Sequence, residues 1–136
     1  MIISKKNLCI VNTSEVCFHD DILISVFFDN GKKEIVLNCQ KGSNSKSEYV
    51  VHFKNVIGFQ MSSCDFWGAS ECIFDFECIS DDDLILIPYL MKEWINIPKL
   101  NTTPNFDNFI EILFTLTSGD KLRIACEYFT INYDYD

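Results

Sequence analysis

Apolar and polar residues alternate along several short segments of the chain, with the period of two that is typical of half-buried β-strands. Residues 21–29 (DILISVFFD) and 32–40 (KKEIVLNCQ) are two such segments, rich in β-branched and aromatic side chains. Between them lies Asn30-Gly31, a pair that tolerates the positive φ angles of a type I′ turn. The pattern therefore predicts a β-hairpin over residues 21–40.

Further strands are predicted beyond the polar loop at residues 41–48. Residues 49–61 predict one strand that ends at Phe53 and another that begins at Val56. From residue 71 to residue 79 the alternation is regular and predicts a strand buried on one face. We expect its side chains to form two opposite sets, one of Cys72, Phe74, Phe76 and Cys78 and the other of Ile73, Asp75, Glu77 and Ile79.

A short helix is one interpretation of the next region. The three aspartates at residues 81–83 suit the N-terminus of a helix that extends through Met91 to Trp94, because the helix dipole favours carboxylates there. Pro88 opposes an uninterrupted helix. A short strand at residues 84–87 followed by a turn of helix is therefore the alternative.

The C-terminal part of the chain predicts a second hairpin. Residues 96–108 contain two prolines and predict a long loop, after which residues 108–117 and 121–131 alternate around the glycine-containing turn at residues 118–121. We count seven or eight strands and at most one or two short helices. The predicted fold is a single domain over residues 1–136, mainly β or α+β with few short helices, whose antiparallel sheet folds over itself as a sandwich or half-barrel.

The composition indicates a chain with a packed core. Hydrophobic residues make up 48% of the 136 residues and include twelve Phe and five Tyr. That much apolar surface offsets chain entropy and excludes intrinsic disorder. No apolar run approaches the roughly 20 residues that span a bilayer, and the N-terminus lacks the long apolar stretch of a secretory signal. We therefore expect a cytoplasmic protein without a membrane partner.

The cysteines are interpreted as small core residues. Their number is odd and they include no CxxC pair, so neither a disulfide framework nor a zinc site is favoured. Free cysteine often behaves as a small buried hydrophobe, and it persists in a reducing cytoplasm. The seven are Cys9, Cys17, Cys39, Cys64, Cys72, Cys78 and Cys126.

No group of residues has the pattern of a catalytic site. Cys17 and His19 are the one thiol and imidazole close in sequence, and Asp20 and Asp21 follow them. A metal-binding or proton-relay fragment is one interpretation of this segment, and a turn that leads into the first long strand is the favoured one. His52 alternates with apolar neighbours and should project from one face of a sheet. Since no nucleophile elbow, phosphate loop or dinucleotide fingerprint is present either, we expect no enzyme, cofactor or metal.

The charge is strongly negative and unevenly distributed. A net charge of −9 with a single arginine, Arg123, argues against a nucleic-acid partner, because phosphate contacts need clustered Lys and Arg. No basic residue occurs between Lys54 and Lys92. A solvated strand face and a helix cap would explain part of this pattern, and a basic protein partner would supply the missing counter-charge. The seven carboxylates of this acidic window are Asp65, Glu71, Asp75, Glu77, Asp81, Asp82 and Asp83.

Trp67 lies inside the acidic window, in the segment DFWG at residues 65–68. One interpretation is that Phe66 and Trp67 cover the edge of the core. The other is that Trp67 anchors an interface, since tryptophan is enriched at interface centres. The C-terminal YDYD at residues 133–136 adds further aromatic and acidic groups.

The order of these segments resembles a group of known proteins. From about His19 to Ile131, the chain is similar in pattern and strand order to small β-rich bacterial immunity proteins of polymorphic-toxin and contact-dependent inhibition systems. The resemblance implies an acidic single domain that binds its cognate toxin, often a basic nuclease, and occludes the toxin's active site or substrate path. It lies in FHDDILISV (18–26), the hairpin after it, YVVHFKNVIGFQM (49–61), CDFWGAS (64–70) and SGDKLRIACEYFTI (118–131).

The sequence therefore predicts an immunity protein that neutralises a toxin domain by direct binding. The acidic window would contact basic residues of the toxin, with Trp67 as the apolar anchor. The alternative is a small β-domain that binds a small apolar ligand in a phenylalanine-lined cavity or serves as a structural subunit. An enzyme ranks third.

Overall fold

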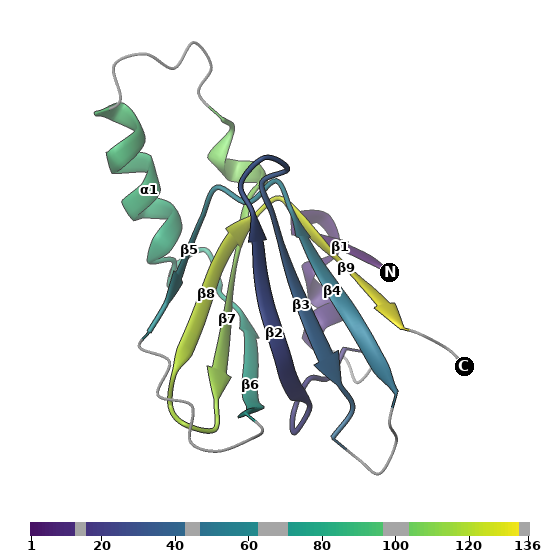
Figure 1. Ribbon diagram of the computed structural model, residues 1–136. Coiled ribbons are helices and arrows are strands. Elements are labelled where there is room, and N and C mark those ends of the chain that lie inside the picture. Colours follow the sequence, from purple (N-terminus) through teal and green to yellow (C-terminus); the bar gives the residue numbers. More distant parts are fainter. Residues whose placement is uncertain (13–15, 43–46, 63–70, 97–103, 134–136) are drawn as a thin grey trace.

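The computed structural model describes residues 1–12, 16–42, 47–62, 71–96 and 104–133 of the chain. These residues form one antiparallel sheet of nine strands in the order β1-β9-β4-β3-β2-β6-β7-β8-β5, and the sheet does not close (Figure 1). The predicted class, mainly β with an antiparallel sheet, is confirmed. The strands are β1 (Ile2–Ser4), β2 (Ile22–Asp29), β3 (Glu34–Gln40), β4 (Glu48–Lys54), β5 (Gly58–Met61), β6 (Glu71–Cys78), β7 (Ile110–Leu116), β8 (Lys121–Cys126) and β9 (Tyr128–Tyr133). The helical segments are α1 (Leu86–Ile95) and two 3₁₀ segments, η1 (Lys5–Asn12) and η2 (Phe106–Asn108).

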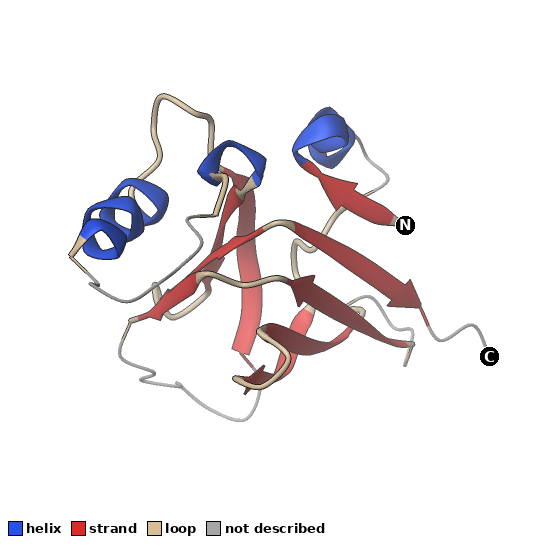
Figure 2. Cartoon of the chain, turned by 90° about the horizontal axis from the view of Figure 1, so that it is seen from above, coloured by secondary structure: helices blue, strands red, loops and turns tan. Residues whose placement is uncertain are grey.

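The sheet has two halves that meet between β2 and β6. Within the described residues these strands pair at two positions, Ile22 with Cys72 and Leu23 with Glu71. One half contains β1, β9, β4, β3 and β2, and the other contains β6, β7, β8 and β5. Seen from above, the strands curve around a common interior (Figure 2).

Aromatic side chains fill the interior between the two halves. Phe18 lies at the junction, with its ring centroid 6.0 Å from that of Tyr49 on β4 and 4.6 Å and 5.6 Å from those of Phe76 on β6 and Phe114 on β7. Tyr49, Phe114 and Phe129 are among the largest fully buried side chains. Burial of such rings is the main favourable contribution to the folding of a small domain.

The hairpin of β2 and β3 forms as predicted, but its turn differs from the prediction. Four residues, 30–33, connect the strands, and the positive φ angle falls at Lys33 (52°) rather than at the Asn-Gly pair. The Lys32 N–H donates a hydrogen bond of 3.0 Å to Asp29 Oδ1, which holds the longer loop. Four-residue hairpin loops are most often built around a type I turn, so the predicted type I′ turn is wrong.

β6 contains a β-bulge that the alternation did not predict. Its register with β7 shifts between Ile73 and Asp75. An extra residue at a bulge reverses the facing of the side chains that follow it. Phe74 is consequently 57% exposed, whereas Ile73 is buried and Phe76 and Cys78 pack against the core. The strand is confirmed, but the assignment of its even-numbered residues to one face is wrong.

α1 begins directly after Ile85, so the aspartates at residues 81–83 lie in the preceding turn instead of capping the helix. The carboxylate of Glu111 on β7 caps it from outside, accepting hydrogen bonds from the N–H groups of Ile85 at 3.0 Å and Ile87 at 2.8 Å. Pro88 falls in the first turn, where its missing N–H breaks no helical bond. Neither alternative for this region was fully correct. Among the described segments, no helix is both long and apolar enough to cross a membrane.

β7 and β8 form the predicted second hairpin, with Gly119 at a φ of 89° in the turn. The single strand predicted at residues 121–131 is instead two strands, because the chain bends at Glu127 and passes from one half of the sheet to the other. β8 pairs with β7 and β5, whereas β9 pairs with β4 and β1. This bend and the unpredicted strand β1 account for the higher strand count.

Candidate functional site

Five of the eight residues predicted to bind a partner can be placed. Asp65 and Trp67 lie outside the described residues, and so does the side chain of Glu71 at the start of β6. Their proposed roles stay predictions. The other five are all exposed: Asp75, Glu77, Asp81, Asp82 and Asp83.

Asp75 and Glu77 lie on the outer face of β6. Asp75 is opposite Thr115 on β7 and Glu77 is opposite Leu113, so the two carboxylates follow each other along one side of the strand. The Phe76 N–H donates a hydrogen bond of 2.9 Å to Asp75 Oδ1. The structure therefore brings two of the predicted residues together on one surface.

The three aspartates between β6 and α1 are partly satisfied within the protein. Lys5 Nζ, from η1, lies 3.1 Å from Asp81 Oδ1, and the Ser80 hydroxyl donates to Asp83 Oδ2 at 3.0 Å. The acidic window thus receives one lysine from elsewhere in the fold, which the spacing of basic residues along the chain did not indicate. Asp82 is exposed, and the described residues place no cation within ion-pair distance of it.

A second surface, not predicted from the sequence, is formed by α1 and β5. Only Lys92 and Glu93 are charged among the ten residues of α1. One side of the helix packs on the sheet, and its outward side carries Lys92 and Glu93. The rest of that side is largely apolar, since Ile85, just before the helix, is 60% exposed, Tyr89 58% and Ile95 84%. A helix on the surface of a globular protein normally turns polar residues outward. Exposed apolar area of this kind marks interaction sites.

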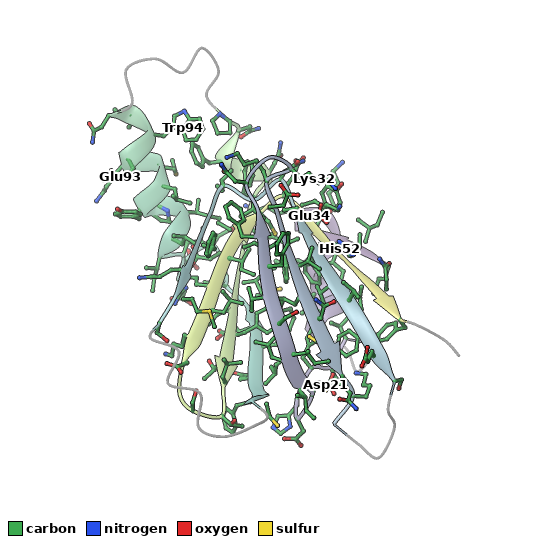
Figure 3. All side chains as sticks on the ribbon, in the orientation of Figure 1. Asp21, Lys32, Glu34, His52, Glu93 and Trp94 are labelled. Atoms are coloured by element: carbon green, nitrogen blue, oxygen red, sulfur yellow. The ribbon has the colours of Figure 1, made fainter. Side chains whose placement is uncertain are left out.

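Two grooves adjoin β5 and meet at Gly58 and Phe59. One has a volume of about 580 Å³ and reaches from β5 to the end of β2 and to Trp94. The other has a volume of about 400 Å³ and lies between β5 and the start of α1. Trp94 lies on the side of α1 that faces η2 (Figure 3), with its ring centroid 6.2 Å from that of Phe106. We call the apolar residues of the two grooves the α1–β5 surface: Phe28, Val56, Ile57, Phe59, Ile85, Leu86, Tyr89, Leu90 and Trp94.

Close contacts fix α1 against the sheet. A Cβ atom on Gly58 would lie 2.7 Å from Leu90 Cδ1, so glycine at this position lets the helix approach β5. Glu111, which is fully buried, holds the start of the helix and also lies 2.7 Å from Arg123 Nη1 on β8. The helix therefore presents its outward side from a defined position.

Two contacts near the α1–β5 surface join the two halves of the sheet. The ring centroids of Phe28 on β2 and Phe59 on β5 are 4.9 Å apart, although the two strands belong to different halves of the sheet. The Val56 N–H donates to the Lys33 carbonyl at 2.8 Å. The first groove therefore lies where the ends of the two halves meet.

A buried polar cluster surrounds Asp21 at the other end of β2. Its carboxylate accepts hydrogen bonds from the Tyr49 hydroxyl at 2.6 Å, Lys41 Nζ at 2.9 Å and the Gly42 N–H at 3.2 Å. Burial raises the pKa of Tyr49, so the hydroxyl stays protonated and donates to Asp21. A Cβ atom at position 42 would lie 1.9 Å from the Asp20 carbonyl oxygen. All the polar groups of this cluster are satisfied by one another, which indicates a structural role.

The two histidines lie apart. His52 projects from the outer face of β4, as expected, and its Nδ1 is 2.5 Å from Glu34 Oε1, which Lys54 Nζ also contacts at 2.7 Å (Figure 3). The hydrogen bond from Lys54 lowers the pKa of Glu34, and the bond from His52 adds to this effect, while burial opposes it. His19 is exposed and pairs with Asp20 at 3.0 Å. Within the described ranges, no three His, Cys, Asp or Glu residues are grouped to hold a metal ion.

The thiols vary in burial. Cys39 and Cys126 are buried, as the interpretation of the cysteines as core residues requires. Burial raises the pKa of Cys39 and of Cys78 to about 12, which keeps both thiols protonated and unreactive at neutral pH. Cys17 is exposed, so the interpretation is wrong for this residue.

One signal in the sequence pointed to the α1–β5 surface. Residues 84–91 are the longest apolar run of the chain. The rest of α1 after this run contains two charged residues, Lys92 and Glu93. The contribution of Phe28 and Phe59 had no such signal, because the two residues lie on strands far apart in the sheet order and meet only in the folded chain.

Comparisons with known proteins identify no family. No protein-family model matches the chain, and no curated protein matches it. A solved structure, described as an uncharacterized protein from Neisseria gonorrhoeae, is similar over 100% of this chain and 99% of that chain, with 12% sequence identity and a TM-score of 0.44.

Proposed function

We propose that the protein binds another protein through the α1–β5 surface and that this partner is a basic toxin domain, which it neutralises in the cytoplasm as an immunity protein. The exposed apolar side of α1 beside β5 is the observation that carries the proposal. Folding does not explain that side of the helix, because the opposite side already packs on the sheet.

The kinds of residue on this surface support a protein partner. Tyr89 and Trp94 belong to residue types that are enriched among the few side chains carrying most of the energy of an interface. Burial of apolar area contributes roughly 25 cal/mol per Å². The fixed position of α1 lowers the entropic cost of forming the complex.

The charge of the protein supports a basic partner. The net charge is −9, and Asp75, Glu77 and Asp82 are exposed carboxylates of the acidic window. Complementary charge accelerates association and rejects acidic competitors. The toxin would therefore contact the apolar surface while the carboxylates of the acidic window steer its approach.

Co-expression tests the proposal. An adjacent upstream gene for a large secreted protein with a variable C-terminal domain would supply the candidate toxin. We expect that this toxin domain alone arrests growth and that co-expression of the protein restores growth. A toxin that binds and is neutralised equally well by a variant without the α1–β5 surface would contradict the proposed site.

Matched variants locate the binding surface. Tyr89→Asp places a charge at the centre of the α1–β5 surface, whereas Ile24→Asp places one at a residue that is 51% exposed on β2. We expect Tyr89→Asp to weaken toxin binding by about 2 kcal/mol or more and Ile24→Asp to leave it unchanged. Isothermal titration calorimetry measures both, and thermal unfolding confirms that both variants fold.

Charge reversal tests the steering role separately. In the variants Asp75→Lys, Glu77→Lys and Asp82→Lys, we expect slower association and a weaker dependence of the association rate on salt, with folding intact. Surface plasmon resonance at two ionic strengths measures the rates. Unchanged association in all three variants would remove the acidic window from the proposed interface.

The groove between β5 and Trp94 favours a second candidate function, the binding of a small apolar ligand. Its volume of about 580 Å³ is in the range of ligand sites, and Phe28, Ile57 and Phe59 line it. Titration with an environment-sensitive apolar dye distinguishes the two functions. Saturable binding that a Phe59→Asp variant loses, together with unchanged toxin binding in that variant, would support a ligand site in this groove.

A further inference from the structure

We infer that the partner inserts an extended segment along the edge of β5 that pairs with no strand of the described residues, where it becomes a tenth strand of the sheet. This inference rests on the proposed function, because it specifies how a protein partner engages the α1–β5 surface. Strand addition supplies affinity through main-chain hydrogen bonds and specificity through the side chains on either side.

The hydrogen-bonding pattern of β5 directs some of its backbone N–H and C=O groups away from β8. The Ser62 N–H donates to the Lys121 carbonyl at 3.0 Å, and the same register pairs Gln60 with Arg123. Because paired positions alternate along an antiparallel ladder, the N–H and C=O groups of Phe59 and Met61 point away from β8. In the part of the chain that the structure describes, β8 is the one strand that pairs with β5.

The opposite edge of the sheet shows how an edge is blocked in this protein. There β1 has its own outward-pointing backbone groups, and the side chain of Asn7 satisfies two of them. The Ser4 N–H donates to Asn7 Oδ1 at 2.7 Å, and Asn7 Nδ2 donates to the Ile2 carbonyl at 2.8 Å. A neighbouring strand therefore cannot pair with β1 without displacing this amide.

β5 lacks two of the usual protections of an edge strand. Its four residues, Gly58–Met61, include no charged residue and no proline, so its short length is the protection that remains. The described residues also place no side-chain amide across it comparable to Asn7. An uncharged, uncapped edge beside an apolar groove is a suitable template for another strand.

The groove between β5 and α1 has room for the side chains of the added strand. It extends along Phe59 and Gln60 on one side and along Ile85 and Tyr89 on the other. A strand on this edge would direct alternate side chains toward α1. The inserted segment should therefore carry apolar residues at alternate positions.

The charge favours a basic segment of another protein over a second copy of this chain. Two copies joined through β5 would each bring a net charge of −9 to the assembly. Repulsion between like charges opposes that arrangement, whereas lysines on the outer side of an inserted segment would be attracted.

Synthetic peptides test strand addition without knowledge of the toxin. The probe is a peptide of roughly eight residues in which valine and lysine alternate, the apolar and basic pattern that the edge would accept. The first control replaces lysine by glutamate. The second control keeps the side chains but N-methylates every residue, which removes the amide donors from both edges of the peptide.

We expect the valine–lysine peptide to bind at least about tenfold more tightly than either control, since one control reverses the charge and the other lacks the hydrogen bonds. Amide chemical shifts should change in Gly58–Met61 and at Ile85 and Tyr89. Equal affinity for the N-methylated peptide, shift changes confined to other strands, or no binding up to roughly 1 mM would each overturn the inference. So would a stable dimer of the free protein in sedimentation velocity that dissociates when β5 is altered.

A pair of variants separates this inference from the proposed function. Phe59→Pro and Phe59→Ala both remove the aromatic ring, but only the proline variant also loses the outward N–H, and β8 does not use that group. We expect Phe59→Pro to bind the peptide and the toxin at least about tenfold more weakly than Phe59→Ala. If the two variants bind the toxin equally while Tyr89→Asp abolishes binding, the proposed function stands and strand addition is wrong. If Tyr89→Asp also binds normally, the proposed function fails.

Discussion

Glu111 joins three elements through a single carboxylate. It is fully buried on β7, accepts hydrogen bonds from two N–H groups at the start of α1 and pairs with Arg123 on β8. α1 has no capping side chain at its own N-cap position. Since carboxylates are favoured at helix N-termini, Glu111 supplies from the sheet what the helix sequence lacks.

Replacing Glu111 should therefore loosen both the helix and the sheet beneath it. We expect Glu111→Ala to destabilise the protein by about 3–5 kcal/mol, because the guanidinium of Arg123 is left without its partner. Urea unfolding followed by circular dichroism measures the change. Glu127→Ala, which removes a carboxylate bonded to the Asn55 side chain, is the matched control and should cost about 1 kcal/mol or less. A similar loss in both variants would contradict the special role of Glu111.

Glu34 gives the protein a defined response to acid. The hydrogen bond from Lys54 lowers the pKa of its carboxyl below the ordinary value of 4.5, with a further contribution from His52. A carboxyl whose pKa is lower in the folded state than in the unfolded state stabilises the protein at pH values above its ordinary pKa. That stabilisation is lost as the pH falls through the lowered pKa.

We therefore expect the difference in unfolding free energy between the wild type and Glu34→Gln to shrink as the pH falls below about 4.5. Chemical unfolding at a series of pH values measures it. Glu48→Gln, on the same face of the neighbouring strand, is the control. A difference that grows as the pH falls would show that the sign of this argument is wrong.

At the scale of the elements, the bulge in β6 assigns opposite roles to two phenylalanines that are only two residues apart. Phe74 is 57% exposed, whereas the ring of Phe76 has its centroid 4.8 Å from that of Phe114. A regular strand would have placed both on one face. The bulge therefore decides which of the two contributes to the core.

Truncating the two rings tests the bulge directly. We expect Phe76→Ala to cost about 3 kcal/mol of stability, because it removes a ring packed in the core. Phe74→Ala should cost less than about 1 kcal/mol. Thermal and urea unfolding of the two variants measures the contrast, and equal losses would indicate an uninterrupted strand.

These elements also show what the sequence predicted and why. The strands at residues 21–29, 32–40 and 49–53 follow from local alternation, which one buried face imposes on a strand. The bulge in β6 and the cap from Glu111 depend on residues more than 20 positions away in the chain, so no local pattern indicates them. The turn at residues 30–33 was predicted with the wrong type because the side chain of Asp29 competes for a backbone N–H.

At the scale of the whole molecule, aromatic packing and a few backbone hydrogen bonds hold the two halves of the sheet together. β2 and β6 pair at two described positions, and two further backbone hydrogen bonds, from Asp20 to Ile73 and from Ile73 to Asp21, extend the junction. Phe18 packs across it against aromatic rings from both halves.

Removing the Phe18 ring should weaken the association of the halves. We expect Phe18→Ala to lower the unfolding free energy by about 3–5 kcal/mol and to accelerate hydrogen exchange of the Asp20 and Ile73 amides. Phe27→Ala removes a ring that is 60% exposed on the outer face of β2 and should have little effect. Junction amides that stay fully protected in Phe18→Ala would show that hydrogen bonding alone holds the halves together.

The candidate site could be predicted from the sequence only in part. The acidic window was visible as a run of carboxylates without local lysines, but the pairing of Asp81 with Lys5 depends on how η1 packs and is not encoded nearby. The α1–β5 surface combines residues from β2, β5 and α1, which are separated along the chain by other strands. A surface of this kind appears only once the sheet has folded over.

Gly42 has a consequence for the evolution of this fold. Any side chain there would collide with the Asp20 carbonyl oxygen, and the glycine N–H also binds the buried Asp21. Position 42 should therefore resist change in every descendant that keeps the Asp21 cluster. An aspartate in the turn before one strand and a glycine just after the next would then serve as a pair of landmarks for aligning distant relatives whose overall identity has fallen too low to detect.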